Sequence, residues 1–244
     1  MYSELEIVVP DAAQLAEEDK EAFALIRRQG LGASDSSIIL GVNNWTTIDQ
    51  LIEQKNTPCI TQEEIEIGNK PNVRMGSDLE EIILKKFSKW SGFITEKPAP
   101  MYRLKDYPML TVNYDGLAKE TGTFNGIWIP VECKTVSMFA DKYWDKTKAI
   151  DSPDQGRRMT YGSATSVQDH ILTQAEWYGI PPYYYTQVQQ QLMGVEADYA
   201  YLAALFVKDW TLRVYKIYED SFVQGAIVAK GAEVAPKCKS IPAF

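Results

Sequence analysis

The stretches Asn113-Tyr114-Asp115-Gly116-Leu117 and Val131-Glu132-Cys133-Lys134-Thr135 decide the fold expected of this chain. Each reads as part of a β-strand, and successive side chains of a strand point to opposite faces of its sheet. Glu132 and Lys134 therefore share one face, while Val131 and Cys133 pack on the other. The pattern predicts that the carboxylates of Asp115 and Glu132 converge with the ammonium group of Lys134.

Two carboxylates beside an ammonium group suit metal-dependent attack on a phosphodiester. Ionised carboxylates are hard oxygen ligands for Mg²⁺ or Mn²⁺, and a nearby lysine can orient a water molecule or steady the growing negative charge. The combination is typical of a metal-dependent nuclease. An ordinary turn and a solvated strand are the alternative, because Asp-Gly often marks a turn and Glu-x-Lys is common on exposed strands.

An amphipathic helix is predicted over residues 77–91, with Ser77 as its N-cap and Gly92 at its end. Glu80 lies beside its apolar stripe, at the edge of whatever cleft the helix covers, and is a third candidate carboxylate. The alternative is that Glu80 and Glu81 are first-turn acids that favour the helix dipole. The stripe recurs at intervals of three and four residues and consists of Leu79, Ile82, Ile83, Phe87 and Trp90.

A second helical segment, residues 183–194, follows Pro181-Pro182 and carries four glutamines among the five positions 187–191. Glutamine is a good helix former, so a polar helix face accounts for several of them. It does not account well for such a density beside three tyrosines.

Taken in order, these segments resemble the λ-exonuclease branch of the PD-(D/E)xK nucleases, the YqaJ-like viral recombinases. The family pattern has an Arg before a Gly-x-Ser region, a helical Gly-x-x-x-Glu, an Asp-Gly at a strand end, a Glu-x-Lys strand and a helix with Gln-x-Gln. The order of the five motifs is more specific than any one of them, and they span about two thirds of the chain. The matching residues are Arg27 with Gly32-Ala33-Ser34-Asp35, Gly76 to Glu80, Asp115-Gly116, Glu132-Cys133-Lys134 and Gln187-Val188-Gln189.

The resemblance implies a catalytic site with two Mg²⁺ or Mn²⁺ ions. Asp115 and Glu132 would bind the metal together with the backbone carbonyl of Cys133, and Glu80 would complete the metal site. Lys134 would position or deprotonate the attacking water. Gln187 would help to orient it.

The resemblance also implies contacts to the 5′-phosphate of a DNA end. Arg27 and Ser34 match the family's phosphate anchors, and Asn113 lies two residues before the catalytic Asp115. A solvated charge at a helix end is the alternative for Arg27, and the adjacent Arg28 competes with it for the phosphate contact.

Residues 141–170 read as a long, polar loop insertion rich in Gly, Ser and Pro. Loops of this length inside a compact domain are usually functional or disordered. One interpretation is that this loop contacts DNA through Arg157 and Arg158. The other is a mobile insertion. Where the family often has an Arg about six residues after the lysine, this chain has Ala140, so Lys142 is the nearest cation for that phosphate contact.

The composition fits a single domain: 244 residues, 45% hydrophobic and 24% charged, can bury a full core. The sequence has no run of eighteen apolar residues and no basic N-terminal region before an apolar stretch. We therefore expect no membrane span and no signal peptide, and we expect a cytoplasmic location. The single histidine, His170, is expected to be exposed in the loop and leaves little material for a His-based mechanism. Three scattered cysteines are too few for a disulfide framework or a Cys-rich metal site: Cys59, Cys133 and Cys238.

The net charge of −8 argues at face value against a nucleic-acid partner, because Lys and Arg neutralise phosphates in such complexes. The charges are unevenly distributed, with acids in residues 4–21 and 63–66 and cations in residues 27–28, 142–148 and 157–158. An acidic exterior with a basic interior channel would fit an enzyme that threads DNA. The resemblance implies such a channel in a ring of three copies of the chain.

The order of the remaining elements predicts an α/β fold, a mixed central β-sheet flanked by helices. The resemblance implies that this is the restriction-endonuclease-like PD-(D/E)xK core, in one nuclease domain over residues 1–244. The expected elements are helices near 12–29, 34–40, 47–55 and 220–231, strands at 94–102, 110–114, 117–120 and 127–134 with a turn at 121–126, and a hairpin of 199–207 with 211–218.

The implied function is a metal-dependent 5′→3′ exonuclease that digests linear double-stranded DNA and leaves 3′ single-stranded overhangs for annealing-type phage recombination. Its partners would be DNA ends, a single-strand annealing protein and further copies of the chain, and its origin a phage or prophage. One alternative is a restriction or repair endonuclease of the same superfamily. The other is a non-catalytic DNA-end-binding protein, against which the retention of all the catalytic residues counts.

Overall fold

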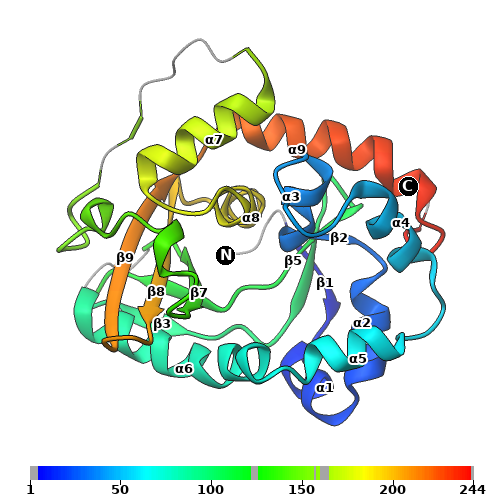
Figure 1. Ribbon diagram of the computed structural model, residues 1–244, viewed down its shortest axis with the longest axis horizontal. Helices are drawn as coiled ribbons and strands as arrows, with labels where there is room; N and C mark the ends of the chain where they lie inside the picture. The colour runs from blue at the N-terminus through cyan, green and yellow to red at the C-terminus, as the bar shows by residue number, and fades with distance from the viewer. Residues whose placement is uncertain (1–4, 122–125, 157, 160–164, 243–244) are drawn as a thin grey trace.

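The computed structural model describes residues 5–121, 126–156, 158–159 and 165–242 (Figure 1). Its strands form two mixed sheets flanked by helices, one in the order β1-β4-β5-β2 and one in the order β3-β6-β7-β8-β9. The predicted α/β class is therefore confirmed, with the strands divided between two sheets. The strands are β1 (Leu5–Val9), β2 (Leu31–Gly32), β3 (Ile94–Glu96), β4 (Met101–Leu104), β5 (Leu110–Val112), β6 (Gly116–Lys119), β7 (Ile129–Val136), β8 (Tyr199–Phe206) and β9 (Thr211–Tyr218).

Helices lie on both sides of the sheets, and α8 runs between them, with α7 and α9 along one side and α6 along the other (Figure 1). None of the helices described is both long and apolar enough to cross a membrane. The α-helices are α1 (Ala12–Glu18), α2 (Lys20–Arg27), α3 (Ser36–Ile39), α4 (Ile48–Asn56), α5 (Gln62–Gly68), α6 (Pro71–Ser91), α7 (Val167–Tyr178), α8 (Pro182–Leu192) and α9 (Ser221–Val234). Single 3₁₀ turns are η1 (Ala33–Asp35), η2 (Asp141–Tyr143), η3 (Lys146–Lys148) and η4 (Ala235–Lys237).

The five-stranded sheet has β7 and β8 at its centre, paired in parallel with Glu132 opposite Leu202. A parallel pair needs a long crossover, and here the crossover contains α7 and α8. The predicted hairpin at the end of the sheet is confirmed by β8 and β9, which pair antiparallel from Tyr199–Tyr218 to Phe206–Thr211. One face of this sheet packs on α6, and the opposite face contributes to the core around α8 and α9.

Helix α6 packs its buried residues Leu79, Ile83 and Phe87 against β7 and β8, as the apolar stripe predicted. Ile82 was wrongly included, since it is 42% exposed, and the buried Leu84 completes the stripe instead. The helix ends at the expected Gly92, whose φ of 74° is left-handed.

The start of α6 differs from the prediction of an N-cap at Ser77. The helix begins at Pro71, because proline is well suited to the first helical position, where its missing N–H has no partner to lose. Gly116 lets this helix approach β6 closely: a Cβ at Gly116 would lie 2.4 Å from Leu84 Cδ1.

Several other element predictions were incomplete. The helix expected over 12–29 is two helices, since the Asp19 side chain caps α2 by accepting from Ala22 N at 2.9 Å. The strand expected over 94–102 is interrupted by Pro98 and Pro100, and its two parts, β3 and β4, belong to different sheets. β1, α5 and α7 were not predicted, and part of the expected turn 121–126 lies outside the described residues.

Candidate active site

Asp115 directly precedes β6, and Glu132 lies on β7, the neighbouring strand of the five-stranded sheet. β6 and β7 pair antiparallel with Gly116 opposite Val131, so Asp115 comes immediately before the point where the pairing begins. The Asp115 Oδ2 accepts a 2.9 Å hydrogen bond from the Cys133 backbone N–H. The strand that carries Glu132 therefore holds the Asp115 carboxylate in place.

Glu132 is 1% exposed and both its carboxylate oxygens have donors. Oε1 accepts from Gln187 Nε2 at 2.5 Å and forms an ion pair with Lys134 Nζ. Oε2 accepts from Gln191 Nε2 at 2.6 Å. A buried carboxylate is tolerated only with partners of this kind, so the group is a preformed polar cluster between β7 and α8.

Gln191 is a residue of the cluster that the sequence reasoning did not assign. Gln187 and Gln191 are four residues apart, so they lie on the same face of α8. The density of glutamines was the sequence feature that could have indicated Gln191. The Gln-x-Gln motif instead included Gln189, whose Nε2 donates to the Tyr218 carbonyl at 2.9 Å.

Burial and like charge dominate the electrostatics of the cluster. Burial and the negative charges of Glu132 and Glu80 together raise the pKa of Asp115 to about 8, against the opposing effects of Lys134 and of the Cys133 backbone N–H. Burial lowers the pKa of Lys134, but the attraction of Glu132 and Asp115 outweighs it and raises that pKa above its usual value. Lys134 is therefore held as an ammonium group beside an excess of negative charge.

Glu80 lies at the rim of this cluster. Its Oε2 pairs with Lys97 Nζ at 2.9 Å, and the two side chains are 27% and 45% exposed. Its charge nevertheless contributes to the raised pKa of Asp115. Glu80 would have to leave Lys97 to join Asp115 in holding a metal ion.

The donor set fits a divalent cation of the Mg²⁺ type. Carboxylate and carbonyl oxygens are the ligands such ions prefer, and Asp115, Glu132 and the backbone of Cys133 supply them within one pair of strands. Burial raises the pKa of Asp115 most, and the negative charges of Glu132 and Glu80, which a bound cation would offset, raise it too. Across the part of the chain that is described, no three His, Cys, Asp or Glu side chains are already grouped as metal ligands, so the backbone carbonyl or Glu80 must complete the set.

An aromatic border extends from the cluster to the surface. Lys134 Nζ lies 5.0 Å from the centre of the Tyr184 ring, and Tyr184 contacts Tyr183 with ring centres 4.5 Å apart. Tyr183 in turn contacts Trp45 at 4.8 Å, and Trp45 is 67% exposed. Two of the three tyrosines beside the glutamines, Tyr183 and Tyr184, thus line the approach to the cluster, and Trp45 was not predicted.

The model of the YqaJ-like viral recombinase domain matches residues 22–198, more than half of the chain and all of the cluster. The chain belongs to the YqaJ-like viral recombinase family. This confirms the family that the order of the motifs predicted.

Individual relatives of this YqaJ-like chain agree with the family assignment. The protein named Uncharacterized protein YqaJ of Bacillus subtilis (strain 168) is 29% identical over 141 residues, which are 57% of this chain and 41% of that protein. The match therefore spans less than half of the length of that relative.

Solved structures of LHK-Exo share the fold. The structure of LHK-Exo in complex with dAMP gives a TM-score of 0.53 at 13% identity, over 88% of this chain and 92% of that one. The alkaline exonuclease LHK-Exo from Laribacter hongkongensis gives 0.51 at 14% identity, over 87% and 91%. At such identities the similarity concerns the fold of this YqaJ-like chain.

The structure gives different surroundings to the two adjacent arginines of the YqaJ-like chain. Arg28 is 5% exposed, and its Nη2 lies 2.7 Å from both Glu64 carboxylate oxygens while its Nη1 donates to the carbonyls of Thr57 and Cys59 at 2.6 and 2.8 Å. Arg27 is exposed, with its guanidinium 5.9 Å from the Phe23 ring centre. Of the two, Arg27 is the one whose charge faces solvent.

Ser34 and Asn113 flank the cluster on the side of the four-stranded sheet. Ser34 is exposed in η1, a turn that packs on α8. The Asn113 backbone carbonyl accepts from Gln191 Nε2 at 3.2 Å, so one amide links Asn113 to Glu132. Both positions are consistent with their predicted roles, which stay predictions.

The cations of the predicted loop insertion have separate surroundings. Lys142 is exposed on η2, 5.0 Å from the Tyr143 ring centre. Arg158 lies over the Tyr218 ring and within 3.9 Å of Asp198 and 3.5 Å of Glu219, so acids of the fold already face it. Arg157 lies outside the described residues, as do 160–164.

The prediction that His170 is an exposed loop residue was wrong. His170 is 5% exposed in α7, and its Nε2 lies 2.7 Å from Asp220 Oδ2, which also accepts from Tyr185 Oη at 2.7 Å. Ser166 caps α7 by accepting from Asp169 N at 3.1 Å, so the helix begins inside the expected loop, and the distant Asp220 gives the imidazole of His170 a buried partner.

Proposed function

We propose that this chain is a metal-dependent 5′→3′ exonuclease that digests linear double-stranded DNA and leaves 3′ single-stranded overhangs for annealing-type recombination. The observation that carries the proposal is the buried Glu132 carboxylate, held by Lys134 and Gln187 beside Asp115. Membership of the YqaJ-like viral recombinase family and the fold shared with an alkaline exonuclease support it. dAMP, the molecule in the LHK-Exo complex, is a nucleoside monophosphate, the kind of product an exonuclease releases.

The metal site would consist of Asp115, Glu132 and the backbone carbonyl of Cys133, with Glu80 joining from the rim. When bound, two Mg²⁺ or Mn²⁺ ions would supply Lewis-acid stabilisation of the phosphate and of the attacking water. The low exposure of Glu132 keeps bulk water away from these charges, which strengthens every electrostatic interaction among them.

Lys134 would act on the negative charge that develops during attack. Its ammonium group is fixed between Glu132 and the Tyr184 ring, so it points at one place without needing to reorganise during the reaction. Gln187 and Gln191 each hold one oxygen of Glu132 and thereby fix the plane of that carboxylate. Lys134 is a group that touches the reacting atoms in this mechanism, whereas Gln187 and Gln191 are positioning residues.

The substrate would be a DNA end with a 5′-phosphate. Arg27 and Ser34 are exposed and offer a cation and a hydroxyl to this phosphate, with Asn113 near the cluster and Lys142 at the exposed turn η2. Copies of the chain would form a ring of three around the DNA, and a single-strand annealing protein would take over the 3′ strand. The proposal includes an origin of the chain in a phage or prophage.

A direct test compares 5′-phosphorylated linear DNA with a closed circle, each with Mg²⁺ and with EDTA. We expect progressive loss of one strand of the linear DNA with Mg²⁺, no loss with EDTA and no change to the circle. Nicking of the circle would instead favour an endonuclease. Binding of the ends without cleavage under either condition would favour the non-catalytic DNA-end-binding protein.

A further inference from the structure

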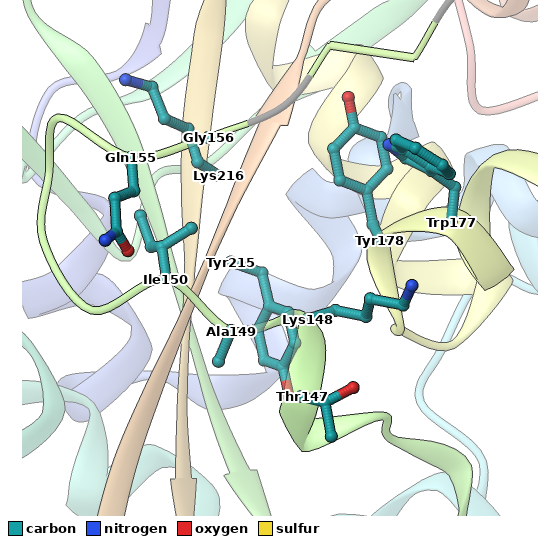
Figure 2. A pocket seen from close by; sticks show the side chains of 10 residues that line it. All are labelled: Thr147, Lys148, Ala149, Ile150, Gln155, Gly156, Trp177, Tyr178, Tyr215 and Lys216. Carbon is teal, nitrogen blue, oxygen red and sulfur yellow. The ribbon is translucent and has the colours of Figure 1, made fainter.

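A cavity of about 340 Å³ lies beside the edge strand β9 (Figure 2), and its lining includes no residue of the cluster around Glu132. Its walls come from η3 and the segment that follows it, from the C-terminal end of α7 and from β9. This volume lies in the range of small-molecule sites. Its chemically distinctive residues are Lys148, Trp177, Tyr178 and Tyr215.

The cavity is close to the catalytic cluster because of the register of the sheet. Glu132 is opposite Leu202, and Leu202 is opposite Tyr215, so these three residues form one row on the same face of the sheet. Adjacent strands are about 5 Å apart, which puts the backbone of Tyr215 roughly 10 Å from that of Glu132.

Aromatic contacts fill the interval between the two sites. The Trp144 ring lies 5.6 Å from the Tyr184 ring and 5.4 Å from the Tyr215 ring, measured between centres. Tyr184 is the ring beneath Lys134. The wall that borders the catalytic lysine therefore continues to the floor of the cavity.

Two polar groups of the cavity lack strong partners among the described residues. The Tyr215 hydroxyl is buried and has no hydrogen-bond partner there, although an unsatisfied buried hydroxyl is costly. Lys148 extends toward Trp177 in Figure 2, with its Nζ 5.7 Å from the ring centre, and forms no ion pair within 4.0 Å in the described part of the chain. A donor and a cation thus meet aromatic rings in one cavity.

We propose that this cavity binds a nucleotide, with the base against Trp177 and Tyr178, the phosphate at Lys148 and a polar group of the ligand at the Tyr215 hydroxyl. An aromatic face beside a cation is the combination that binds bases and their phosphates without regard to sequence. The proposal rests on the proposed function in one respect, that DNA is the substrate. The nucleotide has two possible sources: a released mononucleotide, or a unit still within the single strand.

The test measures binding of dTMP and of the pentanucleotide (dT)₅ by calorimetry in EDTA, so that hydrolysis and metal-dependent binding are absent. Lys148→Ala and Trp177→Ala should each weaken binding about tenfold or more, while Trp177→Phe, which keeps an aromatic face, should restore most of it. The matched controls are Lys146→Ala, on the same 3₁₀ turn but paired with Asp141, and Trp210→Ala, an exposed tryptophan of the β8–β9 turn. Both controls should bind like the unaltered chain.

Tyr215→Phe separates a binding role from a structural one. Because the hydroxyl has no partner in the described residues, its removal should leave the thermal midpoint unchanged or raise it while nucleotide binding weakens. Loss of binding only together with loss of stability would contradict the proposal.

Each remaining outcome has one meaning. If binding of dTMP depends on Lys148, the site is supported and its ligand is a released mononucleotide. If only binding of (dT)₅ depends on Lys148, the site is supported and its ligand is the single strand. Failure of both ligands to bind, or binding that survives both variants, overturns the proposal. Asp115→Asn should lose nuclease activity yet bind both ligands normally in EDTA, so a failure of the proposed exonuclease activity would be visible separately.

Discussion

Helix α8 uses one residue type for two purposes, and the difference lies in what each glutamine reaches. Gln187 and Gln191 donate to the carboxylate oxygens of Glu132. Gln190 donates to the carbonyls of Leu31 and Thr111, in β2 and β5, at 2.8 and 3.0 Å. Adjacent, chemically identical residues therefore serve the site in one case and the attachment of α8 to the four-stranded sheet in the other.

Helix α8 is therefore both a structural link and a wall of the site. The pair Gln187 and Gln191 satisfies a buried charge, and the single residue Gln190 donates to two backbone carbonyls. Substitutions of the pair should therefore change catalysis, and substitutions of Gln190 should change stability.

The largest effect on activity is expected at Asp115, the acid beside Glu132 and its donors Gln187 and Gln191. Asp115→Asn keeps a side-chain oxygen that can accept from Cys133 N but removes a negative charge that the proposed metal ions would need. We expect Mg²⁺-dependent digestion of linear DNA to fall by about 10³-fold or more, with an unchanged thermal midpoint. Activity within tenfold of the unaltered chain, measured as release of acid-soluble nucleotides, would remove Asp115 from the mechanism.

Gln191→Met should have the next largest effect, because methionine has a similar length and no N–H to give to Glu132 Oε2. We expect kcat to fall by about 10²-fold with little change in KM for DNA ends, as for a lost positioning contact. Gln191→Glu is the companion variant, and it should be worse, since it adds a like charge beside Glu132. The proposed distinction fails if Gln191→Met lowers only the thermal midpoint.

Gln190→Met is the matched substitution on the structural side of the comparison. It leaves the Leu31 and Thr111 carbonyls without their side-chain donor, which should cost about 1–3 kcal/mol in the free energy of unfolding. For a chain of this size the thermal midpoint should drop by several degrees, at about 2–4 °C per kcal/mol. Nuclease activity at 25 °C should stay close to normal, and a large loss of kcat without a loss of stability would contradict the division between Gln190 and the pair Gln187 and Gln191.

Arg27 and Arg28 extend the same comparison to adjacent cations. Arg27→Ala should raise KM for 5′-phosphorylated ends about tenfold and leave ends with a 5′-hydroxyl unaffected, because the lost cation would contact the phosphate. Arg28→Ala should instead destabilise the fold, since it removes the cation paired with Glu64 and the side-chain donor of two backbone carbonyls. Equal loss for both kinds of end in Arg27→Ala would show that Arg27 does not contact the 5′-phosphate.

The smallest effect concerns the pH dependence of the Arg28 pair. Burial raises the pKa of Glu64, but hydrogen bonds from Arg28, Thr61 and Gln54 outweigh it and lower the pKa to about 2. Because the folded pKa is below the usual 4.5, the stabilisation is complete above pH 4.5 and is lost as the pH falls toward 2. Urea unfolding of the unaltered chain and of Glu64→Gln should show a stability difference at pH 6 that shrinks below pH 4.5, and a constant difference would contradict the pairing.

The parts of the site that follow from local periodicity were predicted from the sequence. The strand alternation puts Glu132 and Lys134 on one face and Cys133 in the core, as the structure has them. The parts that depend on distant partners were not predicted. His170 is buried because of Asp220, fifty residues away, and Glu80 is drawn to Lys97 rather than into the cluster.

The fold shows the same division between local and distant causes. The hairpin of β8 and β9 was found because two runs rich in aromatic and aliphatic residues are separated by a short turn. β1 was missed because its five residues form a strand only by pairing with β4, about a hundred residues later. The role of Gln191 required knowing which side of α8 faces β7, and the spacing of the glutamines does not give that direction.

The position of α8 between the sheets has a consequence for the order in which the protein is made. Glu80, Asp115, Glu132 and Lys134 all leave the ribosome before residue 182, where α8 begins, and β8, the parallel neighbour of β7, follows later still. During synthesis the acids of the cluster therefore have neither their amide donors nor a completed sheet around them. The nascent chain holds the chemical groups of the catalytic centre well before it can enclose them, so competence for DNA cleavage should arise only at the last stage of folding.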